Sequence, residues 1–227
     1  MSSNPTAFPD GPTRFLLPGA VGAIEVATDT PTTASRLGVA LICHPHPLHG
    51  GSMQNKVVTT TERALRELGL RTLRFNFRGV GQSEGVFDDG VGEGEDLLLL
   101  AQWLRSARPD DAIWLAGFSF GAFVSIARAA EVAPAQLISL APPVGRWQFD
   151  AIAYPDCPWL VIQPEADEVV DASAVYAWAE QLGPRLELVR FPATSHFFHG
   201  QLNALRDALQ TRVRAPLPAW ERPALEH

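Results

Sequence analysis

Two patterns of apolar residues alternate along most of the chain. Short apolar runs, of the length expected for a strand buried on both faces, occur at residues 37–43, 72–77, 112–118, 136–141, 159–163 and 186–191. Apolar residues at helical spacing lie between and after these runs, at residues 55–69, 95–106, 122–130, 172–182 and 198–213. Strands that alternate with helices need crossover connections, so the pattern predicts a mainly parallel, doubly wound α/β sheet.

A different pattern precedes this alternation. Two short apolar segments, residues 14–17 and 23–27, flank the dipeptide Pro18-Gly19, which is typical of a turn. We therefore expect an antiparallel N-terminal hairpin, which brings the sheet to eight strands. Because the alternation continues without a linker or repeat, we expect one domain.

Polar, proline-rich segments lie on both sides of these elements. We expect residues 1–13 to be a flexible N-terminal arm, residues 14–214 to form the domain, and residues 215–227 to be a C-terminal tail. The last three residues, Leu225, Glu226 and His227, resemble the start of an expression tag.

Length, composition and charge narrow the classes of protein. The chain has 227 residues, of which 46% are hydrophobic, enough for a sizeable core. Its net charge of −7 repels polyanions, so we expect neither nucleic acid nor an anionic membrane as a partner. Two cysteines, Cys43 and Cys157, suit a reducing compartment. No run approaches the ~18 apolar residues of a membrane span, and no signal peptide is evident. We expect a cytoplasmic protein.

A candidate nucleophile lies between a predicted strand and the next predicted helix. There the sequence Gly117-Phe118-Ser119-Phe120-Gly121 has the pattern G-x-S-x-G. In this context the serine occupies a sharp, strained turn, and the small residues two positions away let neighbouring segments approach it. The turn also directs the free N–H groups of the next helix to the position of a tetrahedral oxyanion.

A serine hydroxyl needs a base in contact with it and a third group that orients the base. His196 follows the last predicted strand and is expected at the same edge of the sheet as Ser119. The acid is expected between the two in chain order. Three carboxylates lie there after the strand that ends at residue 163, and we favour Asp167, with Glu168 as the second choice and Glu165 facing solvent.

Several motifs in one order give the chain a resemblance to a known superfamily. They are HPHPLHGG (44–51), NFRGVGQSEG (76–85), GFSFGA (117–122), PEADEVV (164–170) and SHFF (195–198). Together they resemble the α/β-hydrolase fold, and within it the small bacterial dienelactone-hydrolase-like and prolyl-oligopeptidase-like serine esterases. The resemblance implies Ser119 as nucleophile, His196 as general base and then acid, and Asp167 as the orienting acid. Dienelactone hydrolases have cysteine in place of Ser119, so their lactone substrate is not carried over.

The histidine-rich loop allows two interpretations. His44, His46 and His49 have the spacing of a metallo-β-lactamase zinc site, but that motif has an aspartate where this chain has Leu48. We therefore favour a site without a metal or other cofactor. In α/β hydrolases this loop supplies one oxyanion N–H, and the residue after the nucleophile, here Phe120, supplies the other. Proline has no N–H, so His46 and Leu48 are the candidates in the loop.

The segment between the predicted strands at 136–141 and 159–163 is too short to build a cap domain. We expect an open, shallow pocket with apolar walls. The candidate wall residues are aromatic: Phe87, Trp147, Phe149 and Phe197.

These features predict a serine hydrolase, foremost a carboxylesterase that cleaves small-molecule esters of short acyl groups through an acyl-enzyme. A thioesterase or a small peptidase or amidase could use the same triad. A non-catalytic ligand-binding module is the alternative from another class, because a fold does not by itself determine function. The sequence leaves the oligomeric state open.

Overall fold

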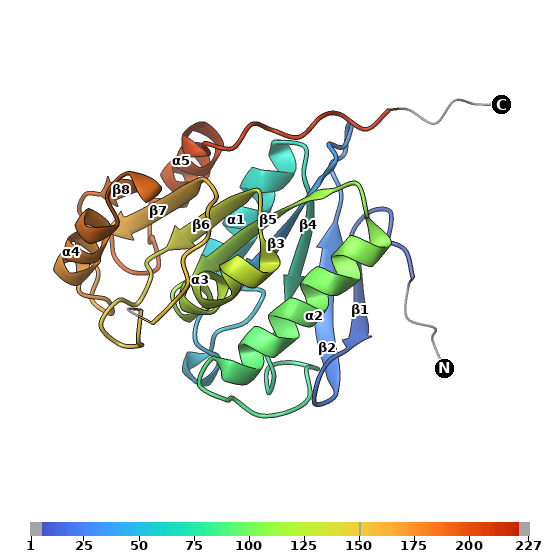
Figure 1. Ribbon diagram of the computed structural model, residues 1–227, viewed down its shortest axis with the longest axis horizontal. Helices are drawn as coiled ribbons and strands as arrows, with labels where there is room; N and C mark the ends of the chain where they lie inside the picture. Colours follow the sequence, from blue (N-terminus) through green and yellow to red (C-terminus); the bar gives the residue numbers. More distant parts are fainter. Residues whose placement is uncertain (1–5, 150, 223–227) are drawn as a thin grey trace.

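An eight-stranded mixed sheet forms the centre of the protein (Figure 1). The computed structural model describes residues 6–149 and 151–222, so the predicted tag remnant lies outside the described residues. The strands are β1 (Thr13–Pro18), β2 (Ala23–Asp29), β3 (Gly38–Cys43), β4 (Arg71–Phe75), β5 (Ala112–Phe118), β6 (Gln136–Leu140), β7 (Trp159–Pro164) and β8 (Glu187–Phe191).

The order of the strands is β1-β2-β4-β3-β5-β6-β7-β8. The first hairpin and the pairing of β2 with β4 are antiparallel, whereas all pairs from β4 to β8 are parallel. The central strands β3, β6 and β7 are buried along their whole length, which explains why the sequence shows unbroken apolar runs there. The predicted mainly parallel sheet with an antiparallel N-terminal hairpin is confirmed.

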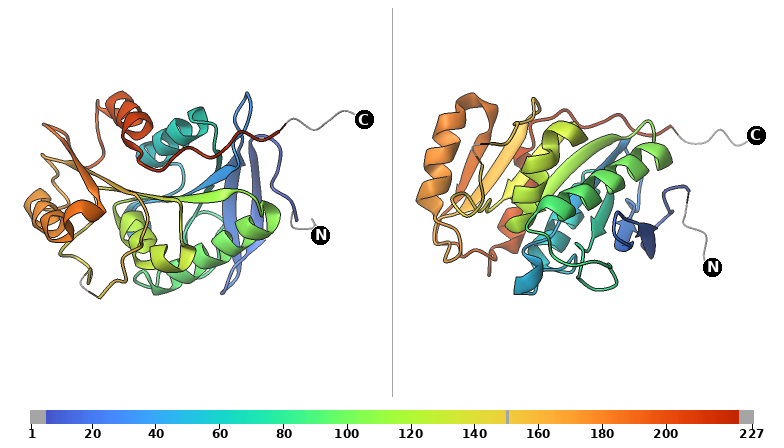
Figure 2. Two further views of the ribbon diagram at one scale, coloured as in Figure 1. Left: turned by 45° about the horizontal axis from the view of Figure 1, so that its top comes forward. Right: turned by 60° about the horizontal axis from the view of Figure 1, so that its bottom comes forward.

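Helices cover both faces of the sheet. They are α1 (Lys56–Glu67), α2 (Val91–Ala107), α3 (Phe120–Val132), α4 (Ala172–Leu182) and α5 (Leu202–Arg212), with short 3-10 helices η1 (Pro47–His49) and η2 (Gly183–Arg185). One core lies between the sheet and the pair α1 and α5, and the other lies between the sheet and α2, α3 and α4. Figure 2 shows these two helical layers on opposite sides of the sheet, so the doubly wound arrangement is confirmed.

Two helices begin four residues away from their predicted starts. α2 begins four residues earlier than expected, because Glu93 accepts hydrogen bonds from the N–H groups of Asp88 and Gly90 and so stabilises the first turn. α5 begins at Leu202 instead of residue 198. Phe198 is fully buried and has a φ of 53°, which is incompatible with a helix that includes it.

The described parts of both terminal segments are packed on the domain. Phe8, in the segment expected to be a flexible arm, is buried with its ring 6.1 Å from that of Trp103. At the other end, the guanidinium of Arg36 lies 3.7 Å from the ring centre of Trp220. The carboxylate of Glu221 is paired with Arg71 and Arg108. The described part of the tail is therefore held to the domain by several contacts.

The connection from β6 to β7 builds no cap, as predicted. Its described residues contain no helix, and the segment leads from the carboxyl end of β6 back to the amino end of the parallel strand β7. Within residues 6–149 and 151–222, none of the helices has the length and apolar composition that crossing a bilayer would need.

Candidate active site

Ser119 occupies a tight turn between β5 and α3. Its backbone has φ 54° and ψ −121°, a conformation that costs energy for a residue with a side chain. A Cβ atom on Gly117 would lie 2.1 Å from the backbone oxygen of Gly121, and one on Gly121 would lie 2.5 Å from the backbone oxygen of His44. The glycines are therefore required, because Gly117 packs directly against the first turn of α3 and Gly121 against the end of β3.

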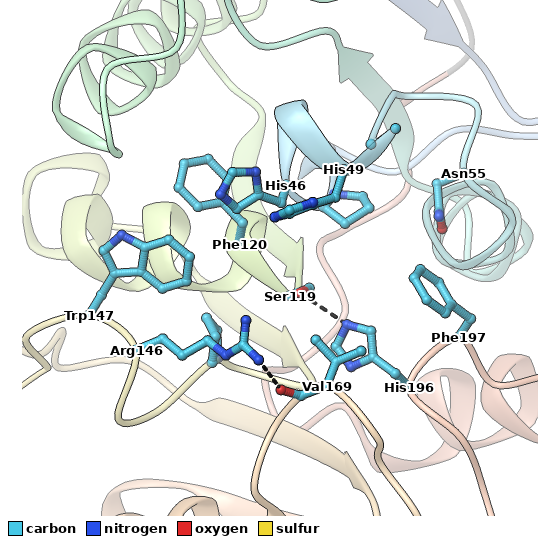
Figure 3. A pocket seen from close by; sticks show the side chains of 14 residues that line it. His46, His49, Asn55, Ser119, Phe120, Arg146, Trp147, Val169, His196 and Phe197 are labelled. Atoms are coloured by element: carbon cyan, nitrogen blue, oxygen red, sulfur yellow. Dashed lines mark hydrogen bonds between the residues drawn. The ribbon is translucent and has the colours of Figure 1, made fainter.

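The structure brings together Ser119, His196 and Asp167, which follow β5, β8 and β7 respectively. Figure 3 shows the hydrogen bond between Ser119 and His196. The Oγ of Ser119 lies 3.0 Å from Nε2 of His196, and Nδ1 of His196 lies 2.8 Å from Oδ2 of Asp167. The Ser119 residue is 8% exposed and His196 is 1% exposed. These contacts form a continuous chain of hydrogen bonds, open to solvent only at the serine.

Asp167 is held in its ionised form and in one orientation. Burial raises the pKa of its carboxyl group. The hydrogen bonds from His196 and from the N–H groups of Val169 and Val170 lower the pKa by more than burial raises it, so the net shift is downward. Both backbone donors lie 2.8 Å from Oδ1, while Oδ2 also accepts from Nε2 of Gln163 at 3.1 Å. The carboxylate can therefore fix the histidine tautomer without taking its proton.

The other two carboxylates of this loop have different positions. Glu168 accepts a hydrogen bond from the backbone N–H of His196 at 3.0 Å, so it positions the chain there and does not contact the imidazole. Glu165 is exposed. Of the three acids considered from the sequence, Asp167 is the one that contacts the ring of His196.

Two backbone N–H groups near Ser119 are available to an oxyanion. Phe120 is the first residue of α3, and within the described chain nothing accepts a hydrogen bond from its N–H or from that of His46. Leu48 was the other candidate donor in the loop, and its assignment is corrected by the structure. Its N–H donates to Nδ1 of His46 at 3.2 Å inside the η1 turn, so it is already occupied.

His44 has a structural position beneath the site. Its Nδ1 lies 2.6 Å from the carbonyl oxygen of Pro45, and its Nε2 accepts the N–H of Phe77 at 2.9 Å. Burial lowers the pKa of His44 to about 4, although the bond to Pro45 acts in the other direction. A neutral ring with both nitrogens occupied joins the ends of β3 and β4, and it has no lone pair left for a metal.

A pocket of about 300 Å³ opens above Ser119. Of the aromatic residues predicted to line it, Trp147 and Phe197 do so. Phe149 does not, because it is buried with its ring 5.5 Å from that of Trp178 in the core. Phe87 packs behind the pocket, with its ring 4.8 Å from that of His46.

Several lining residues were not predicted for the pocket: His49, Asn55, Arg146 and Val169. His49 was considered only as a metal ligand, whereas its ring lies 4.5 Å from that of His46 at the pocket mouth. Arg146 is adjacent to Trp147, and its position next to a predicted wall residue was the one signal available. Partial burial lowers the pKa of His46, and the charges of His49 and Arg146 act in the same direction, against Asp89.

Comparison with known proteins gives the family of the chain. A model of the family described as X-Pro dipeptidyl-peptidase (S15 family) matches residues 24–177. Protein RP471 of Rickettsia prowazekii (strain Madrid E), described as uncharacterised, is 33% identical over 178 residues, which cover 73% of this chain and 74% of that protein.

Two solved structures are similar over nearly the whole chain. XC6422 of Xanthomonas campestris, described as an α/β serine hydrolase without a lid, is 54% identical with a TM-score of 0.88, over 91% of this chain and 95% of that one. An α/β serine hydrolase homologue of Coxiella burnetii is 47% identical with a TM-score of 0.87, over 91% and 99% of the two chains. The chain belongs to the S15 family, and it is an α/β serine hydrolase of the α/β-hydrolase superfamily.

Proposed function

We propose that the protein is a carboxylesterase that uses Ser119, His196 and Asp167 as a catalytic triad. The observation that supports this most directly is the unbroken hydrogen-bond chain from Asp167 through His196 to Ser119 at the floor of the pocket. A neutral His196 that donates its Nδ1 proton to Asp167 has a free lone pair on Nε2 for the serine proton.

In the proposed reaction, Oγ of Ser119 attacks the ester carbonyl carbon while His196 takes its proton. The N–H groups of Phe120 and His46 stabilise the oxyanion that forms, and each such donor is typically worth ~3 kcal/mol. His196 then donates the proton to the departing alkoxide, which leaves as the alcohol. Water, deprotonated by the same histidine, cleaves the acyl-serine and releases the carboxylic acid.

The dimensions of the pocket support small-molecule esters with short acyl groups as substrates. A cavity of about 300 Å³ lies at the small end of ligand-binding pockets, and no cap extends it. The two free cysteines, Cys43 and Cys157, support a cytoplasmic location, because thiols stay reduced there.

The description of the matching family makes cleavage after an N-terminal X-Pro dipeptide a second candidate. Recognition of a peptide N-terminus requires acceptors for its ammonium group. Among the described residues, no aspartate or glutamate lines the pocket. The ester is therefore the better candidate.

A chain-length series of p-nitrophenyl esters tests the proposal. We expect hydrolysis of the acetate and butyrate, a decline beyond the octanoate, and loss of activity in Ser119→Ala. Ser195→Ala is a matched control, because Ser195 is adjacent to His196 but its hydroxyl contacts His199. Wild-type activity in Ser119→Ala would refute the assignment, and activity that rises steadily beyond octanoate would refute the short-chain preference. A non-catalytic module would hydrolyse none of the esters.

A further inference from the structure

The pocket above Ser119 has the opposite charge character to the protein as a whole. The chain carries a net charge of −7, yet no carboxylate is among the described residues that line the pocket. The polar side chains there, apart from those of Ser119 and His196, belong to His46, His49, Asn55 and Arg146. Three of these four are cationic or can become so.

Arg146 is the fixed charge in this group. Figure 3 shows its side chain extending from the segment after β6 along the side of the pocket to Val169. One nitrogen, Nη2, donates to the carbonyl oxygen of Val169 at 2.7 Å, which holds the guanidinium in place. Within residues 6–149 and 151–222, no carboxylate forms an ion pair with Arg146. A guanidinium has five N–H donors, so several remain for a ligand.

The two histidines add donors on the other side of the pocket. Nδ1 of His46 accepts the Leu48 N–H, so the proton of the neutral ring is on Nε2. His49 lies against the His46 ring at the mouth of the pocket. The negative charge of Asp89 raises the pKa of His46, against the effect of burial. Asp89 itself accepts the indole N–H of Trp147 at 3.2 Å and does not line the pocket.

We propose that this pocket selects acyl esters with a second, ionised carboxylate, such as half-esters of dicarboxylic acids, and that Arg146 determines this specificity. The inference rests on the proposed function. A guanidinium matches a carboxylate as a planar, two-donor partner, and it remains charged at all relevant pH values. Hydrolysis of the half-ester anion then consumes one water and releases the alcohol, the dicarboxylate and one proton.

Two substrates of the same shape test the inference. They are p-nitrophenyl hydrogen adipate and p-nitrophenyl 6-oxoheptanoate, which differ in having a terminal carboxylate or a terminal methyl ketone. We expect the wild type to have a kcat/KM about tenfold higher for the half-ester, because a hydrogen bond to a charged group is worth about 1.5 kcal/mol. In Arg146→Gln, the ratio of the two kcat/KM values falls close to one, and in Arg146→Lys it is intermediate.

Arg63→Gln is the matched control, because it removes one positive charge from an exposed site on α1 where the guanidinium pairs with Glu67, and Arg63 does not line the pocket. The ratio should be unchanged in this variant, and in the wild type it should fall with added salt. Equal use of both substrates by the wild type, or an unchanged ratio in Arg146→Gln, overturns the inference while the esterase proposal stands. If the wild type hydrolyses neither substrate, the proposed function fails.

Discussion

The nucleophile turn and the start of the segment between β6 and β7 both lie at the carboxyl edge of the sheet, but they are built differently. At the turn, Ser119 and its neighbours are buried, and an added Cβ on Gly121 would clash with backbone atoms. In the β6–β7 segment, Gly145 and Arg146 are exposed, and a Cβ on Gly145 would meet nothing within 4 Å. The geometry that serves the chemistry is fixed by dense packing, whereas the wall that contacts a substrate has room to vary.

The largest effect is expected at the buried end of the triad. In Asp167→Asn, the amide oxygen can still accept the N–H groups of Val169 and Val170, so the loop is retained. The amide cannot hold His196 in the tautomer that leaves Nε2 free, so we expect kcat to fall by about 10⁴. Ester hydrolysis measures this loss, and an unchanged melting temperature shows that the fold is intact. A loss below tenfold would remove Asp167 from the triad.

A pair of alanine substitutions tests the contrast in packing directly. Gly121→Ala places a Cβ 2.5 Å from the His44 oxygen and 2.6 Å from the Cys43 oxygen, and backbone atoms cannot move away easily. We expect a loss of about 3 kcal/mol or more in the free energy of unfolding, together with loss of activity. Gly145→Ala costs only about 1 kcal/mol, from its φ of 86°. Urea unfolding of both variants measures these losses in the free energy of unfolding. Equal losses in the two variants would contradict the contrast in packing.

Acid should destabilise the packed edge through His44. The unfolded chain takes up a proton on this residue near its ordinary pKa of 6.5, whereas in the folded protein burial lowers that pKa to about 4. Between these values the unfolded state binds more protons, so stability is retained above pH 6.5 and falls with decreasing pH toward 4. The expected slope from this residue is about 1.4 kcal/mol per pH unit.

The pH dependence of the unfolding free energy in His44→Asn isolates this contribution. The variant is less stable at neutral pH, but the part of the slope due to His44 should be absent. An identical slope in the wild type and the variant would show that the buried imidazole does not cause it.

The smallest effect is expected at the wall of the pocket. Trp147 packs against Phe123 with ring centres 5.3 Å apart and contributes its face to the pocket. In Trp147→Ala we expect KM for butyrate esters to rise about three- to tenfold, with kcat little changed, because the lost contact serves substrate binding. Steady-state kinetics measures it, and a loss confined to kcat would instead give Trp147 a role in the chemistry.

The same contrast explains what the sequence could predict. Strands β5 and β7 are buried apolar runs, and β8 is a partly buried edge strand with apolar residues at Leu188, Val189 and Phe191. The three triad residues lie in the segments after these strands, so the apolar pattern and the parallel topology together predicted that they would meet. The start of α2 was placed late because its first turn, with Gly92 and Gly94 beside the capping Glu93, has no apolar period.

The pocket wall was predicted less well. Phe149 and Trp147 are two residues apart and equally aromatic, yet one is buried in the core and the other lines the pocket. In a segment without regular secondary structure, the sequence has no helical or strand periodicity that would indicate which way a side chain points. Arg146 was missed for the same reason, and Leu48 was a candidate donor until the η1 turn showed its N–H to be occupied.

Reaction with a fluorophosphonate tests the central claim most directly, because this reagent phosphonylates an activated serine and releases fluoride. The account predicts one adduct per chain, mapped by mass spectrometry to Ser119, and the loss of esterase activity in proportion to labelling. Labelling should be absent in Ser119→Ala and much slower in Asp167→Asn. Failure of the wild type to react, or an adduct on another serine such as Ser195, would contradict the account.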